Sequence, residues 1–384
     1  MSDPIDSLQI GMHWFSERPG GLDRMFMALI QSLPAQGVSV RGLVAGSPGV
    51  EQASGGTVRA FAAPQAKLGT RLWQARSHSR ALKRARVPDV VATHFALYAA
   101  PTVGVFPKVP RVVHFHGPWA DESVQEGRRS ISGALRQSLE RFVYRGGTRH
   151  IVLSKAFGHI LQTQYRVSED SIRVVPGCVD VARFDTGLTR REARARLNLP
   201  QDRPLLFCVR RLVRRMGLED LVDAMFVVKQ AVPDVLLTIA GTGPLEAQLR
   251  ARIVARGLAS HVQLTGYVTD EDLPHWYTAA DVTVVPSLAL EGFGLTTIES
   301  LAAGTPVLVT PVGGLPEAVV PLSQDLVLPS GGFHAIGSGI ADALRGQRTL
   351  PDTASCRAYA LARFDQPVVA GLVAQVYREA IDAF

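Results

Sequence analysis

Short apolar runs alternate with longer segments of helical periodicity along most of the chain. In the first half, runs that predict strands lie at residues 8–12, 38–44, 90–94, 111–115, 150–154 and 173–175. Between them, residues 22–33 repeat apolar side chains at helical spacing, and residues 131–144 predict another helix. Strands that alternate with helices predict a parallel sheet with helices on both faces.

The same alternation begins again after an irregular, charged stretch. Predicted strands lie at 205–209, 235–240, 262–265, 282–285 and 307–310, and predicted helices at 218–232, 245–255, 273–280, 296–303 and 366–383. We therefore predict an N-terminal domain over 1–177, a linker over 178–200, a C-terminal domain over 201–364 and a C-terminal crossing helix over 365–384. The length of 384 residues fits two domains.

Composition sets broad limits on the kind of protein. Hydrophobic residues make up 46% of the chain and charged residues 20%, which is enough to build packed cores. The net charge of +7 favours anionic partners such as nucleotide diphosphates or acidic lipid head groups, or it only keeps the protein in solution. No nucleic-acid recognition motif accompanies this charge, so we predict no nucleic-acid partner.

Neither secretion nor membrane insertion is indicated. The three cysteines have no metal-ligand or redox spacing, which fits a reducing compartment. The first residues show no signal-peptide pattern, and no apolar run approaches the roughly 18 residues of a transmembrane helix. We expect a cytoplasmic protein.

Residues 67–86 form a strongly basic segment with helical periodicity. It contains seven lysines and arginines and no acidic residue, and Trp73 lies near the edge of its apolar face. Such a helix either lies on an anionic membrane or packs its leucines inward with a solvated basic face. Peripheral contact with the inner face of the membrane is therefore one of two interpretations.

The most informative stretch is 286–319, PSLALEGFGLTTIESLAAGTPVLVTPVGGLPEAV. Glu291 ends a loop, a glycine-flanked turn follows, and Glu299 lies eight residues later on the predicted helix. A loop that leads into a helix N-terminus presents free backbone N–H groups to phosphate. Carboxylates accept hydrogen bonds from sugar and ribose hydroxyls, although Glu299 alone also fits a charge placed at a helix start.

Histidines lie at the ends of two predicted strands of the first domain. His116 follows the strand 111–115, at the end where ligands bind in parallel sheets. We expect His114 to point to the face of the sheet opposite to His116, so His114 is the second candidate after His116 for a functional histidine. A zinc site built from His94, His114 and His116 lacks a carboxylate or cysteine at a recognisable ligand spacing, so no metal is predicted.

The stretch 286–319 resembles the retaining glycosyltransferases of family 4. Their signature is E-x7-E, preceded by Pro-Ser and followed by a Gly-Thr-Pro-Val strand and a Gly-Gly loop. Glu291, Glu299, Gly304–Val307 and Gly313–Gly314 match it. The resemblance implies the α/β architecture called GT-B, in which two Rossmann-like domains with parallel sheets face each other across a cleft. It also implies metal-independent transfer from a nucleotide-sugar.

The resemblance assigns roles residue by residue. It implies that Glu299 holds the ribose, and that Glu291, His116 and Arg211 act at the reaction centre, with Arg211 neutralising the departing diphosphate. The other donor-binding candidates are Gly20, Gly21, Phe293, Gly294, Leu295, Thr296, Gly266, Tyr267, Val268 and Arg215. Trp119 and Glu122, just past the histidine loop, are candidates for binding the acceptor.

Two positions depart from the family pattern. Met216 stands where the family has a lysine, and Arg210 stands where it has a glycine. The main prediction is a retaining, front-face hexosyltransferase that uses a nucleotide diphosphate-sugar, with UDP as the favoured base, and an unknown hydroxyl acceptor. The alternatives are a sugar phosphorylase on the same scaffold and a non-catalytic nucleotide-sugar-binding subunit, which Met216 motivates.

Overall fold

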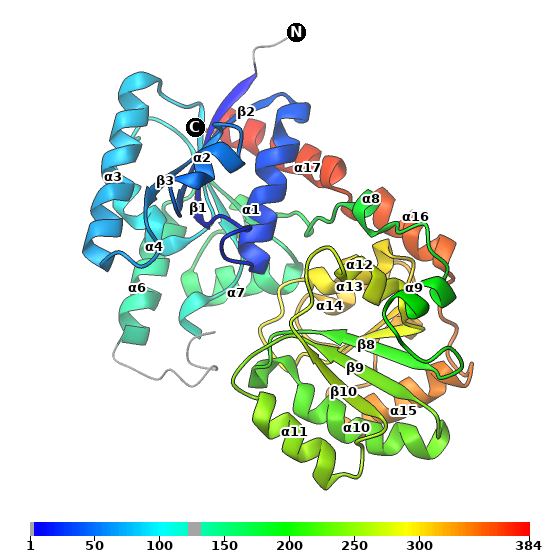
Figure 1. The fold of residues 1–384 in the computed structure, drawn as a ribbon. Helices are drawn as coiled ribbons and strands as arrows, with labels where there is room; N and C mark the ends of the chain where they lie inside the picture. Colours follow the sequence, from blue (N-terminus) through cyan, green and yellow to red (C-terminus); the bar gives the residue numbers. More distant parts are fainter. Residues whose placement is uncertain (1–3, 122–131) are drawn as a thin grey trace. The chain divides into compact units, whose positions relative to one another are not determined.

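The computed structural model describes residues 4–121 and 132–384, which form two compact units. Unit 1 takes the chain up to Cys178 and includes the C-terminal segment Gln366–Phe384. Unit 2 contains Val179–Asp365. Each unit holds one parallel sheet covered by helices on both faces (Figure 1).

Unit 1 is built on a seven-stranded sheet in the order β3-β2-β1-β4-β5-β6-β7. All neighbouring strands are parallel. The strands are β1 (Ile5–His13), β2 (Val38–Ala45), β3 (Val58–Ala62), β4 (Val90–Thr93), β5 (Arg111–Phe115), β6 (Arg149–Val152) and β7 (Ile172–Val174). Their central residues are almost all buried, as expected for a sheet covered on both faces.

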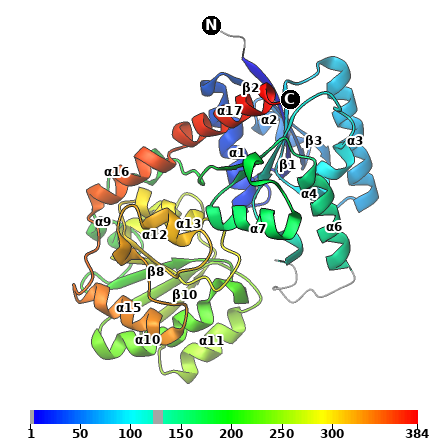
Figure 2. The ribbon, with the colours of Figure 1, turned by 180° about the vertical axis from the view of Figure 1, so that it is seen from behind.

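Two helical layers cover this sheet (Figures 1 and 2). On one face lie α1 (Gly21–Ser32) and α17 (Gln366–Asp382), which contact each other. The other face carries α3 (Leu68–Ala85), α4 (Ala96–Ala99), η2 (Ala100–Thr102), α6 (Ser132–Arg145) and α7 (Lys155–Tyr165). The remaining short helices are η1 (Leu33–Gln36), α2 (Gly49–Ala53) and η3 (Glu169–Ser171).

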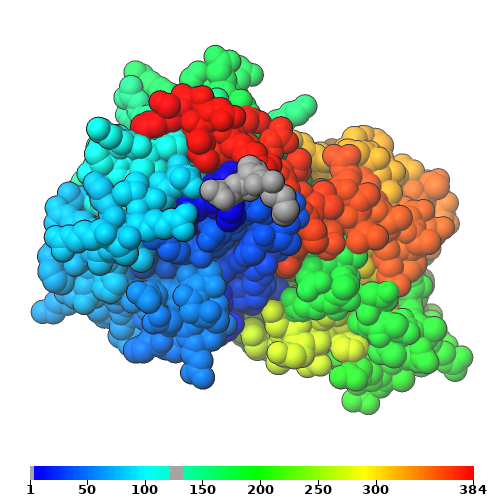
Figure 3. All heavy atoms as spheres, turned by 90° about the horizontal axis from the view of Figure 1, so that it is seen from above, coloured from blue at the N-terminus to red at the C-terminus, as the bar shows by residue number. Residues whose placement is uncertain are grey.

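The C-terminal helix belongs to unit 1, as the crossing-helix prediction required. α17 packs along η1 and α1 and also contacts β4, β5 and β6. Figure 3 shows this red helix lying against the blue N-terminal segments. Val373 and Tyr377 on its inner face are fully buried. The last residues of the chain therefore complete the core of the first sheet.

Unit 2 contains a five-stranded parallel sheet in the order β10-β9-β8-β11-β12. Its strands are β8 (Leu205–Val209), β9 (Leu236–Ala240), β10 (Val262–Gly266), β11 (Val282–Val285) and β12 (Val307–Val309). One face is covered by α10 (Leu218–Ala231), α11 (Glu246–Ala255) and α15 (Phe333–Leu344). The other carries α8 (Val181–Phe184), α9 (Arg190–Arg196), α12 (Leu273–Ala279), α13 (Leu295–Ala302) and α16 (Thr353–Phe364). Shorter turns are η4 (Arg214–Met216), α14 (Leu315–Val319) and η5 (Gln324–Leu326).

Most of the segment predicted as a linker is an ordered part of unit 2. α9 begins at a capping box in which Thr189 and Glu192 bond to each other's backbone N–H. The buried Arg194 then donates to Ala279 O at 2.9 Å and to a carboxylate oxygen of Asp281 at 2.7 Å. These bonds fix α9 beside α12, so the chain passes between units near Cys178 and Val179.

None of the helices formed by the described residues is both long and apolar enough to cross a bilayer.

Candidate active site

The candidate donor site lies in unit 2, at the carboxyl ends of β8 and β11. The strand order reverses between these neighbours, because β9 and β10 follow on one side of β8 and β12 on the far side of β11. Ligands of open parallel sheets bind at such a switch point. The turn after β8 supplies Arg210, and the loop after β11 supplies Ser287 and Glu291.

Glu291 is held by a buried ion pair that the sequence did not reveal. Its Oε2 atom lies 3.0 Å from Arg210 Nη2 and accepts a 2.8 Å hydrogen bond from the hydroxyl of Ser287. Arg210 also donates to Ser287 Oγ at 3.1 Å. Glu291 and Arg210 are 8% and 9% exposed, so water screens the pair only weakly. The arginine at a position where the family has glycine therefore orients this carboxylate.

Two glycines allow the chain to fold closely around Glu291. Gly313 has φ +56°, and a Cβ there would lie 2.0 Å from the backbone oxygen of Glu291. That oxygen also accepts from Gly314 N at 3.0 Å. Gly294, at φ +73°, turns the chain into α13. Larger residues at Gly313 and Gly294 would displace the loop, since L-residues rarely adopt such φ values.

Glu299 lies on α13 and is 4% exposed. Its Oε2 atom accepts a 2.9 Å hydrogen bond from the hydroxyl of Tyr277, a fully buried side chain on α12. Sequence reasoning missed Tyr277, because a tyrosine in an amphipathic helix gives no signal of its partner. The structure therefore places both glutamates of the E-x7-E motif among buried polar partners in one region of unit 2.

Several polar atoms in this region find no hydrogen-bond partner among the described residues. They are Arg210 Nε and the hydroxyls of Thr296 and Thr297, all buried. Buried polar groups are nearly always satisfied in native proteins, so orphans that cluster around a loop and a helix start mark a place where a ligand would supply the missing bonds.

The other predicted donor-site residues occupy different environments. Leu295 and Thr296 form the half-buried first turn of α13, whereas Phe293 is 4% exposed and packs edge-to-face on Phe364. Gly266 ends β10 at φ +76°, and Tyr267 beyond it is 65% exposed. The half-buried Val268 follows these two residues in the chain.

The arginines of the turn after β8 divide into exposed and buried residues. Arg211 is exposed, whereas Arg215 is 8% exposed and donates to Leu290 O at 3.3 Å, which braces the loop before Glu291. Met216 is part of the hydrophobic core between the sheet of unit 2 and the helices α10, α11 and α15. The family's lysine position is therefore a core position here, and Arg210 brings a cation to the end of β8 instead.

Unit 1 has its own switch point between β1 and β4. Gly20 and Gly21 carry the chain from the turn after β1 into α1. Asp23 in the first turn of α1 accepts from His13 N at 2.9 Å, and a Cβ on Gly20 would lie 3.0 Å from a carboxylate oxygen of Asp23. Burial raises the pKa of Asp23 to about 7.

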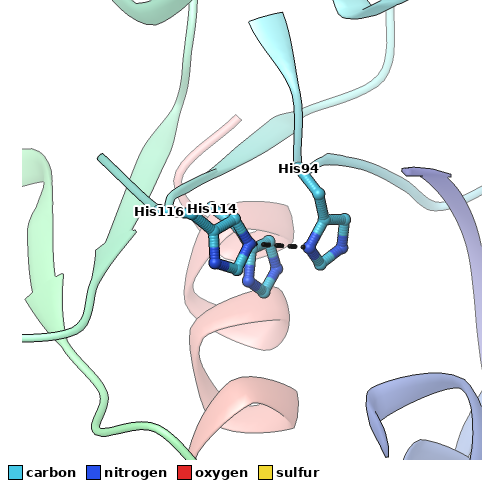
Figure 4. Close-up of side chains that lie close together, drawn as sticks. All are labelled: His94, His114 and His116. Carbon is cyan, nitrogen blue, oxygen red and sulfur yellow. Dashed lines mark hydrogen bonds between the residues drawn. The ribbon is translucent and has the colours of Figure 1, made fainter. Parts of the chain in front are cut away.

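Three histidines stack together at this edge of the sheet (Figure 4). The His94 ring lies 4.1 Å from that of His114 and 5.5 Å from that of His116, measured between centroids, with interplanar angles of 20° and 23°. The expectation that His114 points to the opposite face is wrong. Residues two apart in a strand share a face, so His114 and His116 both meet His94.

The histidine cluster is also the place where a metal ion would find ligands. One nitrogen from each ring lies within 4.8 Å of the others. However, His94 already bonds through both nitrogens, to His116 Nε2 at 3.2 Å and to Gln9 Oε1 at 3.0 Å. Apolar side chains of α1 and α17 line the space beside His114 and His116. The absence of a metal stays a prediction.

Trp119, an acceptor-site candidate, is held by a buried carboxylate. Glu140 on α6 accepts from Trp119 N at 2.9 Å and from the hydroxyls of Tyr144 and Tyr165 at 3.3 and 3.0 Å. The Trp119 ring packs edge-to-face on Phe95 at 5.2 Å. Glu122, the second acceptor-site candidate, lies outside the described residues.

Solved structures share this architecture over almost the whole chain. Sucrose-phosphate synthase from Thermosynechococcus elongatus superposes with a TM-score of 0.78 at 23% identity, covering 99% of this chain and 100% of that one. The Anabaena protein Alr3699/HepE, solved with UDP and glucose, gives 0.75 at 19% identity, covering 98% and 100%. The fold is therefore that of the GT-B glycosyltransferases.

Sequence comparisons name the family. The model "Glycosyltransferase Family 4" matches residues 19–183, and "Glycosyl transferases group 1" matches 189–362. A D-inositol 3-phosphate glycosyltransferase of Arthrobacter sp. (strain FB24) is 30% identical over 78% of this chain and 76% of its own. A 2-deoxystreptamine N-acetyl-D-glucosaminyltransferase of Streptomyces fradiae is 26% identical over 86% and 85%. The protein belongs to glycosyltransferase family 4 and is a glycosyltransferase.

The Glu140 cluster predicts a pH-dependent stability. Burial raises the pKa of Glu140 from 4.5 to about 7. The native state thus binds this proton more tightly than the unfolded chain does. The protonated Glu140 therefore adds to the free energy of unfolding at low pH, and this contribution is lost as the pH rises from the unfolded pKa through 7. Glu140→Gln should match the wild type near pH 5 and exceed its stability at pH 8 by on the order of 3 kcal/mol.

Thermal unfolding of both proteins between pH 5 and 8 checks this prediction. Glu246→Gln, which changes an exposed carboxylate on α11, is the control and should run parallel to the wild type. Parallel curves for Glu140→Gln and the wild type would show that Glu140 is ionised in the native state throughout this range.

Proposed function

We propose that the protein transfers a sugar from a nucleotide diphosphate-sugar to a hydroxyl acceptor, with retention of anomeric configuration and without a metal ion. The observation that carries this proposal is the buried arrangement around Glu291 and Glu299 at the switch point of unit 2. Its orphan donors and the start of α13 offer hydrogen bonds of the kind that phosphates and hydroxyls need.

Each part of the donor has a proposed contact. Glu299, already fixed by Tyr277, accepts from the ribose hydroxyls. Glu291, fixed by Arg210 and Ser287, keeps its Oε1 atom for the hydroxyls of the donor sugar. The first turn of α13 and the arginines of the β8 turn take the diphosphate. His116 in unit 1 keeps its proposed contact with the donor sugar.

The proposed reaction is a front-face substitution. The bond between the anomeric carbon and the diphosphate oxygen breaks, and its electron pair leaves with the phosphate. The acceptor oxygen bonds to the same face of the anomeric carbon, and its proton passes to the leaving phosphate. Arg211 stabilises the charge that develops on the leaving group.

Among the described residues no cysteine is placed as a covalent nucleophile, which supports the front-face route over a covalent intermediate. Glu291 is engaged by Arg210, and all three cysteines are buried. Burial raises the pKa of the thiols of Cys208 and Cys356 to about 12, so neither ionises near neutral pH. Some glycosyltransferases bind a metal through an Asp-x-Asp sequence, which Asp270 and Asp272 match. Here Asp270 pairs with Arg183 at 3.4 Å and Asp272 accepts from the hydroxyl of Thr269 at 3.1 Å, which supports a structural role and metal independence.

The names of relatives bear on the substrates. A Mycobacterium tuberculosis relative, 34% identical over 45% of this chain, is named a GDP-mannose-dependent phosphatidylinositol monomannoside mannosyltransferase. We keep UDP as the proposed base, with GDP as the alternative that must be separated from it. The relatives named for inositol phosphate and 2-deoxystreptamine support a small polyhydroxylated acceptor that packs on Trp119.

The first experiment is a screen of UDP-, GDP- and ADP-sugars in the presence of EDTA, read by thermal shift and by release of nucleotide. We expect stabilisation by one base and slow hydrolysis of its sugar. Preference for a free sugar phosphate would favour a sugar phosphorylase. Binding that never gives turnover with any polyol acceptor would favour a non-catalytic subunit.

Substitution of the two glutamates separates their roles. Glu299→Gln should raise the KM for the donor roughly 10- to 100-fold, because charge-assisted hydrogen bonds to the ribose are lost. Glu291→Gln should mainly lower kcat. The isosteric amide keeps the packing in both variants, and circular dichroism checks the fold. Wild-type kinetics from both variants would contradict the assignment.

We also propose that unit 1 contacts an anionic membrane at the inner face, through α3 and α6. On α3, Trp73 is 69% exposed, and Arg80 and Arg84 are exposed on the same side. On α6, Leu135 and Phe142 are 72% and 58% exposed. Both helices contact η2 on one face of the sheet, and neither presents an exposed acidic side chain in its described part.

Not every cation of α3 is free for lipids. Arg71 donates to Tyr98 Oη, Arg76 to Pro101 O and Lys83 to Val105 O. These bonds hold the helix on unit 1, and Arg86 just beyond it pairs with Asp6 at 3.0 Å. Lys67, Arg80 and Arg84 remain exposed. The segment therefore packs inward and still offers a basic outer face, which combines the two interpretations of its sequence.

Vesicle sedimentation tests this surface. Binding to phosphatidylglycerol-containing vesicles should exceed binding to pure phosphatidylcholine and fall with salt. Replacing Arg80 and Arg84 by glutamine should weaken it roughly 30-fold, at about 1 kcal/mol per cation. Arg250→Gln, an exposed arginine of unit 2, is the control. Equal binding by both variants would exclude α3.

A further inference from the structure

A continuous buried hydrogen-bond chain connects the C-terminal helix to His116. It runs through Tyr377 on α17, Gln9 on β1 and His94 after β4. Gln9 and Tyr377 are fully buried, and His94 is 3% exposed. His116, at the end of the chain, is half-buried and lies within hydrogen-bond distance of His94 (Figure 4). Such a chain fixes the direction of each bond, because every group has a limited number of protons and lone pairs.

The orientation of the Gln9 amide is set at its far end. The hydroxyl of Ser7 donates its only proton to Ser39 O at 3.0 Å. Ser7 Oγ must therefore accept from Gln9 Nε2, which lies 3.1 Å away. The amide oxygen of Gln9 then faces His94 Nε2 at 3.0 Å. An amide oxygen carries no proton, so His94 must carry a proton on Nε2.

The tautomer of His116 follows from that of His94. Burial lowers the pKa of His94 well below its usual value, so the ring is neutral and its Nδ1 has no proton. The 3.2 Å contact between His94 Nδ1 and His116 Nε2 is a hydrogen bond only if His116 donates from Nε2. Burial also lowers the pKa of His116, to about 4, so its Nδ1 is a bare acceptor near neutral pH.

Tyr377 closes the network from the side of α17. Its hydroxyl lies 3.0 Å from both Gln9 Nε2 and His114 Nε2, and 3.2 Å from Gln9 Oε1. It accepts the amide proton from Gln9 Nε2, and both Gln9 Oε1 and His114 Nε2 lie within reach of its own single proton. The ring of His114 stacks on His94. The C-terminal helix thus holds both partners of His94, the amide and the stacked ring.

We propose that Gln9 and Tyr377 are positioning residues that fix His116 as the neutral Nε2–H tautomer, with Nδ1 presented as a hydrogen-bond acceptor. The partner of Nδ1 is then a donor group, such as a hydroxyl of the substrate, and not a phosphate or carboxylate oxygen. His116 accordingly orients a hydroxyl and supplies neither positive charge nor a proton. The identity of that hydroxyl rests on the proposed function, whereas the tautomer does not.

Nuclear magnetic resonance of the full chain labelled with 15N-histidine tests the proposal directly. Two-bond ¹H–¹⁵N correlations at pH 7.5 in EDTA distinguish the two neutral tautomers from the charged ring. His116→Asn identifies the His116 signals by their loss. We expect His94 and His116 to be Nε2–H.

Two variants then release the network. Gln9→Met removes the acceptor of His94 and should leave His116 in a mixture of tautomers. With the donor found in the screen, kcat/KM should fall roughly twofold, in proportion to the correct tautomer. Tyr377→Phe removes one of the groups that hold the Gln9 amide, so it should shift the His116 tautomer in the same direction but less, and it tests the chain again if Gln9→Met does not fold. Tyr165→Phe removes another buried tyrosine hydroxyl of unit 1, bonded to Glu140, and should leave all three tautomers unchanged.

Three outcomes would overturn the proposal. They are a charged or Nδ1–H His116 in the wild type, a His116 tautomer unaffected by Gln9→Met, and stoichiometric Zn²⁺ binding in EDTA-free buffer that shifts all three histidines together. The last would make the cluster a metal site. The tautomer signals are read without substrate, so a failure to find any sugar donor would refute the proposed function and leave this test intact.

Discussion

A carboxylate removed from water needs partners for its charge, and this constraint shapes the whole donor region of unit 2. Glu291 meets it with Arg210 and Ser287, and Glu299 meets it with Tyr277. These partners come from the turn after β8, the loop after β11 and the helix α12. The carboxylates therefore fix the relative positions of three separate segments, and a ligand that binds them meets a site that is already organised.

The same logic operates in unit 1 with neutral groups. Gln9, His94 and Tyr377 lie between the sheet and the layer of α1 and α17, where charged groups would be costly. Each group forms hydrogen bonds with its neighbours in the network. Burial lowers the pKa values of His94 and His114, which keeps both rings neutral. The C-terminal helix thus has a second role beside covering the sheet, because it completes a polar network that ends at His116.

The sequence was sufficient for the architecture and for the two motif glutamates. Strand runs such as 282–285 and the glycine turn before α13 are local signals, and the structure has both. The sequence did not show that the family's lysine position is filled by a core residue and that the nearby cation comes from Arg210, because both depend on contacts between distant parts of the chain. Met216 packs under the sheet while Arg210 pairs with Glu291, and nothing in the spacing of these residues shows which one faces inward. The stretch 178–200 was predicted to be a linker because its own residues show no sign of the bonds that order it. Those bonds run from Arg194 to Ala279 O and Asp281, which are far away in the sequence.

Hydrogen–deuterium exchange of the 384-residue chain, with saturating UDP or GDP and without nucleotide, tests the location of the donor site most directly. The account predicts that one nucleotide slows exchange in the segments 209–217 and 286–299, since the turn after β8, the loop after β11 and the start of α13 hold the donor. Protection confined to unit 1, with these two segments unchanged, would contradict it.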